Sequence, residues 1–265
     1  MQQLKPTEIL QVTIQSAVNR AESSFGKLLV LGLLAGAFIS LAGAGANMAG
    51  YYFLADPATI GIGRMLSGIV FPAGLIMVSL AGAELFTGNN MMVAAVFDKK
   101  LSISSILRNW LIVYIANLMS SIFIACLIVY SGMLDTGGGM LGDVTISIAA
   151  SKVSLSFGQA FVRGIFCNFL VCLAVWIANG ADSTIGKIFG IFFPIFLFVT
   201  AGFEHSVANM FSIPAGIFAD GGNAGLTWNA FFVHNLFPVT LGNMIGGGFF
   251  AAGSYYLAYK RYEKA

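Results

Sequence analysis

Glu204 and His205 stand side by side within a long apolar stretch of the chain. A titratable group in the middle of a bilayer costs about 3 kcal/mol or more on insertion scales, so such residues usually face a cavity. An imidazole there can donate a hydrogen bond to an anion or exchange a proton with it near neutral pH. The alternative is a core histidine bonded to a carbonyl, but the adjacent carboxylate favours the functional interpretation.

A second carboxylate occurs in a similar motif earlier in the chain. Glu84 ends the tetrapeptide Ala-Gly-Ala-Glu and Glu204 ends Ala-Gly-Phe-Glu, and Asn-Met follows shortly after each. Further matching pairs are Asn109 with Asn235, and Asn117 with Asn243. The sequence therefore looks like two copies of one unit. Glu84 either shares the role of Glu204 or caps backbone N–H groups that a helix break sets free.

The composition indicates a membrane protein. Of the 265 residues, 58% are hydrophobic and only 9% are charged, whereas a soluble domain carries roughly a quarter charged residues. A spanning helix needs about 20 apolar residues, so the chain has room for about six spans. The net charge is +2 and the basic residues are scattered, which argues against nucleic acid as a partner. With two histidines, and three cysteines at spacings unlike a metal site, we expect no metal and no cofactor.

Apolar segments predict six transmembrane helices in a single domain, residues 1–265. They cover residues 28–54, 65–97, 107–131, 157–179, 186–219 and 230–258. Before them, residues 7–26 alternate apolar and polar side chains with the period of an amphipathic helix, which we expect to pack on the membrane or on the spans. The predicted fold class is thus an all-α polytopic membrane protein.

The basic residues predict the orientation. With six spans both termini lie on one side, together with ten of the thirteen lysines and arginines: Lys5, Arg20, Lys27, Lys99, Lys100, Arg108, Lys187, Lys260, Arg261 and Lys264. Only Arg64, Lys152 and Arg163 fall on the opposite side. The positive-inside rule therefore predicts cytoplasmic termini and a location in the cell (cytoplasmic) membrane.

The internal similarity predicts two repeats, residues 28–131 and 157–258. Three spans in each copy require the second copy to be inverted, with helices 2 and 5 broken at the matching Glu motifs. Broken backbone at bilayer depth is tolerated only where protein or a water-filled cavity covers it, so paired breaks point to a substrate pathway. The glycine pairs Gly32/Gly36 and Gly242/Gly246 predict close helix contacts.

Apolar side chains lead towards both breaks. Phe71, Leu75 and Phe198 are candidates for dry constrictions of a narrow pore, although most such side chains contact lipid or core. Lys152, predicted in the external loop, would raise the local anion concentration at an entrance; otherwise it is an ordinary solvated lysine.

The motifs Ala81-Gly-Ala-Glu-Leu-Phe-Thr-Gly88 and Gly202-Phe-Glu-His-Ser-Val-Ala-Asn-Met-Phe211 closely resemble the formate/nitrite transporter family. The resemblance covers essentially the whole chain. It implies an aquaporin-like six-helix protomer in a homopentamer, with one pore in each protomer, and it implies that residues 7–26 match an N-terminal helix linked to gating.

The resemblance also implies roles for particular residues. Leu85, Phe86 and Thr87 resemble the mobile loop at the first break, with Thr87 facing His205. Phe71, Leu75 and Phe198 match two hydrophobic constrictions, to which Leu85 and Phe86 are also assigned. Lys152 matches an external basic residue, and Asn168 an amide that helps bind the anion. Glu204 would orient or tune the imidazole.

These features predict a channel for small monovalent anions rather than an enzyme. Apolar gates penalise a bare charge much more than a neutral acid, so a proton supplied through His205 would help the anion cross. The family includes formate, nitrite and hydrosulfide channels. The Phe203-Glu204-His205 motif favours formate, whereas the Gly88-Asn89-Asn90 loop suits hydrosulfide equally well. A membrane-embedded enzyme subunit would need further converging ligands, and an aquaporin-type pore would need Asn-Pro-Ala turns; neither occurs in the sequence.

Overall fold

The six predicted spans are confirmed. A computed structural model describes residues 3–222 and 225–261, and every regular element in these ranges is helical. Within them, six helices are long and apolar enough to cross a membrane: Phe25–Leu54, Ile60–Gly82, Ile103–Tyr130, Phe157–Gly180, Thr184–Ala201 and Ala230–Lys260. Lys264, one of the residues used to predict the orientation, lies outside the described residues.

The first half of the chain holds three spans and a helix that precedes them. The elements are α1 (Pro6–Ala21), α2 (Phe25–Leu54), α3 (Ile60–Val70), α4 (Pro72–Met77), the π-helix η1 (Val78–Gly82), α5 (Phe86–Asn89), the 3₁₀ turn η2 (Asn90–Met92), α6 (Val93–Phe97) and α7 (Ile103–Tyr130). A further 3₁₀ turn, η3 (Met133–Asp135), leads to the second half.

The second half repeats this order. Its elements are α8 (Met140–Val153), α9 (Phe157–Gly180), α10 (Thr184–Ala201), α11 (Ser206–Asp220), the π-helix η4 (Ala230–Leu236), α12 (Phe237–Ile245), the π-helix η5 (Gly246–Gly253), α13 (Ser254–Tyr256) and the π-helix η6 (Leu257–Arg261). The sequence reasoning missed α8, because it assigned residues 132–156 to an external loop.

Both predicted breaks are present. Span 2 stops at Gly82, whose φ of 83° lies in the left-handed region, and resumes at Phe86. Span 5 stops at Gly202 (φ 72°) and resumes at Ser206. Glycine adopts this conformation without the steric cost that a Cβ brings, so it ends a helix readily.

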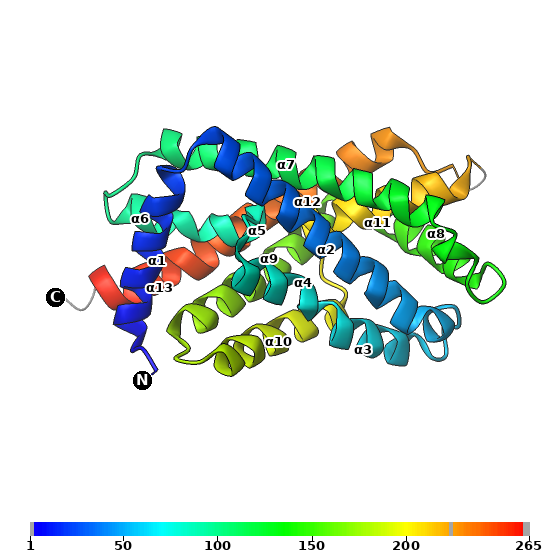
Figure 1. The fold of residues 1–265 in the computed structure, drawn as a ribbon, viewed down its shortest axis with the longest axis horizontal. Helices are drawn as coiled ribbons and strands as arrows, with labels where there is room; N and C mark the ends of the chain where they lie inside the picture. Colours follow the sequence, from blue (N-terminus) through cyan, green and yellow to red (C-terminus); the bar gives the residue numbers. More distant parts are fainter. Residues whose placement is uncertain (1–2, 223–224, 262–265) are drawn as a thin grey trace.

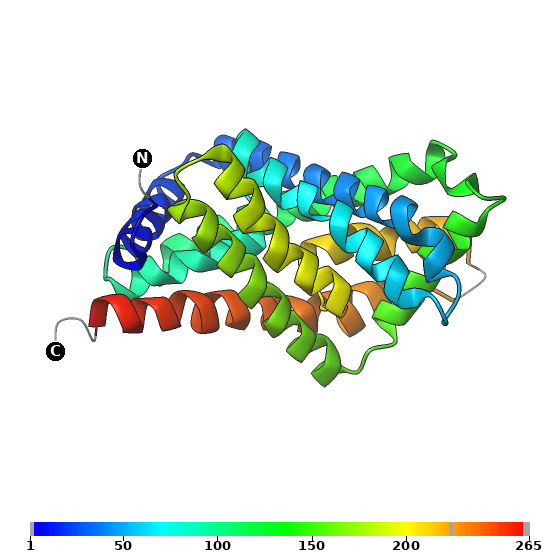
Figure 2. The ribbon, with the colours of Figure 1, turned by 90° about the horizontal axis from the view of Figure 1, so that it is seen from below.

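The two halves are inverted relative to each other, as the repeat predicted. α2 runs away from the end of the molecule that carries α1 and α13, and α9 runs back towards it (Figures 1 and 2). The predicted glycines allow close packing in both halves. A Cβ on Gly36 would overlap the side chain of Ser120 on α7, and one on Gly242 would overlap the backbone carbonyl of Phe161 on α9.

α1 lies across the end of the bundle and runs in a different direction from the spans (Figure 1). Its apolar face is buried, including Ile9, Leu10 and Ile14, so α1 is the packing helix that the amphipathic pattern predicted. Leu4 N–H donates to the carbonyl of Gly180, at the end of α9. The polar face is left to line a cavity described below.

The outer faces of the spans are apolar. On α7, exposed residues recur every fourth position: Ile103, Leu107, Leu111, Ile115, Met119, Phe123 and Leu127. On α10 the same spacing is followed by Ile185, Phe189, Phe193 and Leu197. Stripes of this length are not tolerated in contact with water, so lipid or neighbouring protein covers them.

Candidate functional site

The first break is closed around Glu84. Its carboxylate accepts hydrogen bonds from Arg20 Nε (3.1 Å) and from Asn89 Nδ2 (2.6 Å). Asn117 Nδ2 on α7 donates to the Glu84 carbonyl (3.1 Å) and to the carbonyl of Gly32 (2.8 Å) on α2. These contacts pin the non-helical residues to all three spans of the first half. Glu84 thus binds side chains and does not cap free backbone N–H groups.

The second break is closed around Glu204 in the same way. Its carboxylate binds Lys152 Nζ (3.0 and 3.2 Å) and Asn209 Nδ2 (2.6 Å). Asn243 Nδ2 donates to the Glu204 carbonyl (3.0 Å) and to that of Gly164 (2.8 Å). Each of these partner residues in the second half therefore has a counterpart in the first: Lys152 matches Arg20, Asn209 matches Asn89, and Asn243 matches Asn117.

Because Lys152 lies in α8 and Arg20 in α1, these two helices are also counterparts. Asn109 Nδ2 donates to the Arg20 carbonyl (3.5 Å), and Asn235 Nδ2 donates to the Lys152 carbonyl (2.9 Å). Each structural repeat therefore begins one helix earlier than the predicted repeats, residues 28–131 and 157–258. The first repeat begins with α1 and the second with α8. Lys152 is in the last turn of a helix rather than in a loop, which corrects the sequence-based placement.

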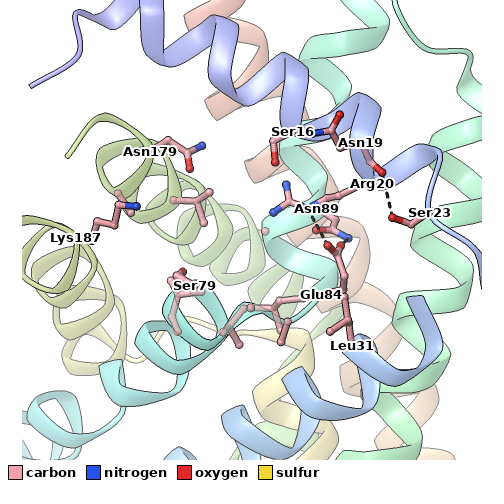
Figure 3. Close-up of a pocket in the computed structure, with 18 of the residues that line it drawn as sticks. Ser16, Asn19, Arg20, Ser23, Leu31, Ser79, Glu84, Asn89, Asn179 and Lys187 are labelled. Carbon is pink, nitrogen blue, oxygen red and sulfur yellow. Dashed lines mark hydrogen bonds and ion pairs between the residues drawn. The ribbon is translucent and has the colours of Figure 1, made fainter. Parts of the chain in front are cut away.

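Two cavities lie on either side of the breaks. The cavity beside α1, which we call the terminal vestibule, has a volume of about 370 Å³. Ser16, Asn19 and Arg20 of α1 project into it, opposite Ser79, Asn179 and Lys187 (Figure 3). The cavity at the opposite end, which we call the far vestibule, has a volume of about 260 Å³ and contains Arg64, Lys152, Arg163, Glu204 and His205 in its wall.

A layer of apolar side chains separates the two vestibules. Phe71 and Phe198 line the far vestibule and pack edge to face, with ring centroids 5.7 Å apart. Leu75 and Leu85 line the terminal vestibule. All four side chains are buried. The structure thus brings these predicted constriction residues together at the ends of the two cavities.

Phe86 is not in the wall of either vestibule. Its ring packs edge to face on Tyr114 (4.8 Å between centroids) and on Trp110 (6.0 Å) of α7. The expectation that Phe86 forms part of a constriction therefore does not fit this conformation. Instead, the ring anchors the start of α5, where the Phe86 N–H donates to Asn117 Oδ1 (3.0 Å).

His205 and Thr87 meet across the two halves. His205 Nε2 lies 2.9 Å from Thr87 Oγ1, and His205 Nδ1 accepts the N–H of Ala208 (3.0 Å) at the start of α11. Since Nδ1 is an acceptor, the imidazole is neutral, carries its hydrogen on Nε2 and donates to Thr87. The Thr87 hydroxyl hydrogen is then not used in the bond to His205.

Glu204 does not contact the imidazole through a hydrogen bond. Both carboxylate oxygens are occupied by Lys152, and Oε2 also accepts from Asn209 and Asn235. The expectation that Glu204 orients the ring directly is replaced by an indirect arrangement. Glu204 fixes the backbone of the break, and His205 is the next residue along it.

Asn168, on α9, is fully buried. Its Nδ2 lies within hydrogen-bond distance of the Thr87 carbonyl (3.2 Å), Asn90 Oδ1 (2.8 Å) and the Asn243 carbonyl (2.7 Å). A primary amide has two hydrogens, so this group is saturated by protein acceptors. Asn168 therefore holds the backbone of Thr87 in place, and its amide N–H groups are not free for an anion.

Glu204, His205 and Thr87 could be identified from the sequence. Lys152, Asn168 and Asn243 were also named there, but not as the residues that hold them. Arg20 was considered only as one of the basic residues that predict the orientation of the chain in the membrane. A signal for its role was present, since Ser24-Phe25-Gly26 and Ser156-Phe157-Gly158 are repeated with the same separation as Arg20 and Lys152. Both serines cap the following span, accepting from Lys27 N and Gln159 N. Among the described residues, no group of His, Cys, Asp or Glu side chains is arranged to hold a metal ion.

Known proteins share the fold and have similar sequences. The formate/nitrite transporter family matches residues 7–257. A probable formate transporter of Methanothermobacter thermautotrophicus is 44% identical over 96% of both chains. Among solved structures, a pentameric formate channel with formate bound is 34% identical with a TM-score of 0.78, covering 89% of this chain and 97% of its own. An FNT family ion channel is 30% identical with a TM-score of 0.84, covering 95% and 99%.

Proposed function

The chain belongs to the formate/nitrite transporter family, and we propose that it is a channel for small monovalent anions, with formate as its first substrate. The observation that carries this proposal is a pair of vestibules with basic walls, separated by an apolar layer in which His205 and Thr87 are the facing polar pair. Nitrite and hydrosulfide are the alternative substrates, because the same pore groups serve any of these small anions.

The apolar layer sets the selectivity of the channel. A bare charge pays a large desolvation penalty between Phe71, Phe198 and Leu75. The hydroxyl of Thr87, polarised by the Nε2–H of His205, offers a hydrogen-bond donor at this point. A small anion that can accept such a bond, or that can cross as its neutral acid, passes more readily than a larger or more strongly hydrated ion.

Asn168 contributes as a positioning residue and Lys152 through its ion pair with Glu204. Leu85, on the first break, moves with Thr87 when the layer opens. We place the terminal vestibule on the cytoplasmic side of the cell membrane, following the distribution of basic residues. The functional unit is a homopentamer of protomers, each consisting of one channel domain over residues 1–265 with its own pathway.

The direct test is flux into proteoliposomes followed by stopped flow. Formate, nitrite and hydrosulfide are compared with glycerol and with a divalent anion such as sulfate. We expect rapid flux of at least formate and none of sulfate or glycerol. Glycerol flux without anion flux would contradict the proposal and indicate a neutral-solute pore.

Proton coupling through His205 is tested by the pH dependence of formate flux. Nδ1 can take up a proton only after the bond to the Ala208 N–H breaks, so a relay requires the start of α11 to rearrange. If the imidazole supplies protons, His205→Phe changes the pH profile, with expression and assembly as controls. A normal profile in this variant would remove His205 from proton transfer and leave only its hydrogen bond to Thr87.

A further inference from the structure

The three basic residues of the far vestibule differ in how their charge is compensated. Lys152 binds both carboxylate oxygens of Glu204, and its side chain is 18% exposed. Neither Arg64 nor Arg163 has a side-chain hydrogen bond or ion pair with any residue in the described parts of the chain, and both are exposed. The uncompensated positive charge of this cavity therefore resides on the two arginines.

Both arginines lie at the rim of the second break. The Arg64 guanidinium packs over Gly202, where a Cβ would come within 3.3 Å of Nη1. Arg163 is on α9, and its carbonyl accepts the N–H of Glu204 (3.3 Å). The two side chains therefore reach the same cavity from spans 2 and 4, next to the residue that precedes His205.

From this arrangement we propose that Arg64 and Arg163 form an anion-loading site for small carboxylates and oxoanions at the far mouth of the pathway. Lys152 serves instead to neutralise Glu204 and hold the break. The proposal rests on the proposed channel function and identifies the residues that capture its substrate.

The chemistry of the site suits such anions. A guanidinium is planar, always charged and presents paired N–H groups that match the two oxygens of a carboxylate or nitrite ion. It is also less strongly hydrated than an ammonium, so it gives up water to an anion more readily. A cavity walled by three cations and one carboxylate concentrates anions, an effect that falls as salt is added.

Lipid phosphates are a second source of the same chemistry, because the exposed guanidiniums could bind headgroups at the membrane surface. The proposal commits to the permeating anion. The assay therefore uses vesicles of phosphatidylcholine alone and, in parallel, vesicles with added phosphatidylglycerol. If the substitutions had an effect only in vesicles that contain phosphatidylglycerol, the arginines would bind lipid headgroups, and the proposal would be overturned.

The experiment measures formate and nitrite influx from the far side as a function of concentration, in proteoliposomes whose protein orientation is fixed and checked by cleavage of a C-terminal tag. Arg64→Gln and Arg163→Gln should each raise the half-saturating concentration of the anion. The double variant should raise this concentration on the order of tenfold at low salt. The maximal flux should change little in all three variants. The difference should shrink at high ionic strength. Arg64→Lys keeps the charge and should retain most of the loading.

Lys99→Gln is the matched control, since it removes one exposed positive charge that lies in neither vestibule. Unchanged half-saturation in the double arginine variant, or an equal change in the Lys99 variant, would overturn the proposal. A wild-type protein that conducts no formate or nitrite at all would instead contradict the channel function, so the two failures are distinguishable.

Discussion

The carboxylates of the two breaks stabilise the pathway without lining its narrowest part. Glu84 and Glu204 each accept hydrogen bonds from one basic residue and one asparagine five positions ahead. Their charge is thereby neutralised inside the protein. In the proposed pathway the anion meets the neutral pair of His205 and Thr87, and the two carboxylates maintain the geometry on which this pair depends.

Removing only one partner of the Lys152–Glu204 pair leaves an uncompensated buried charge, which costs about 3–5 kcal/mol. Lys152→Met should therefore destabilise the protein strongly. Adding Glu204→Gln should restore most of the loss, because the Gln carbonyl oxygen can still accept from Asn209 and Asn235. The measurement is the temperature at which the detergent-solubilised oligomer is lost on size exclusion.

Lys100→Met serves as the control, since its pair with Asp98 is longer (3.7 Å) and the Lys100 side chain is 46% exposed. Such a surface pair contributes about 0–1 kcal/mol. A double variant at Lys152 and Glu204 that is as unstable as Lys152→Met alone would show that the packing of the lysine, and not its charge, is what matters.

At the scale of elements, the spans could be predicted and their supporting helices only in part. Runs of apolar residues gave all six spans, and the matching Glu motifs gave both breaks. α8 (Met140–Val153) was missed because it is short and mixes polar with apolar residues, so no long apolar run marks it. The equivalence of α8 with α1 is visible in the structure through Lys152 and Arg20. In the sequence it is indicated by the Ser-Phe-Gly that follows each of them at the same separation.

The contact between α9 and α12 depends on glycine. A Cβ on Gly242 would overlap the carbonyl of Phe161, a backbone atom that cannot move without shifting α9. Gly242→Ala should therefore cost about 1–3 kcal/mol and displace Asn243, which holds the second break. Oligomer stability and formate flux should both fall.

Gly158→Ala is the matched control, because Gly158 lies near the start of α9, the helix that Gly242 contacts. A Cβ at this position would meet nothing within 4 Å, and alanine favours a helix over glycine by at most about 1 kcal/mol. Its stability should stay the same or rise slightly. If both variants behaved alike, the close approach of α9 and α12 would not limit the stability of the second half.

At the scale of the whole molecule, one chain supplies a complete pathway. Both vestibules, the apolar layer and the His205–Thr87 pair come from the same protomer. Assembly into a pentamer would cover part of the exposed apolar stripes on α7 and α10 without adding residues to the pathway. We therefore expect oligomerisation to contribute stability and each protomer to conduct on its own.

This separation predicts how mixed assemblies conduct. Leu75→Trp places a larger side chain in the apolar layer and should block its own protomer, while Leu75→Met conserves most of the volume and should conduct. When wild-type and Leu75→Trp subunits are co-expressed in known ratios, formate flux per pentamer should fall in proportion to the blocked fraction, because each pathway opens independently. A shared pathway on the central axis would not pass Leu75, which is buried inside the protomer, so formate flux would stay unchanged even in pentamers made only of Leu75→Trp subunits. Unchanged flux of this kind, with normal pentamers and active Leu75→Met mixtures, would contradict one pathway per protomer.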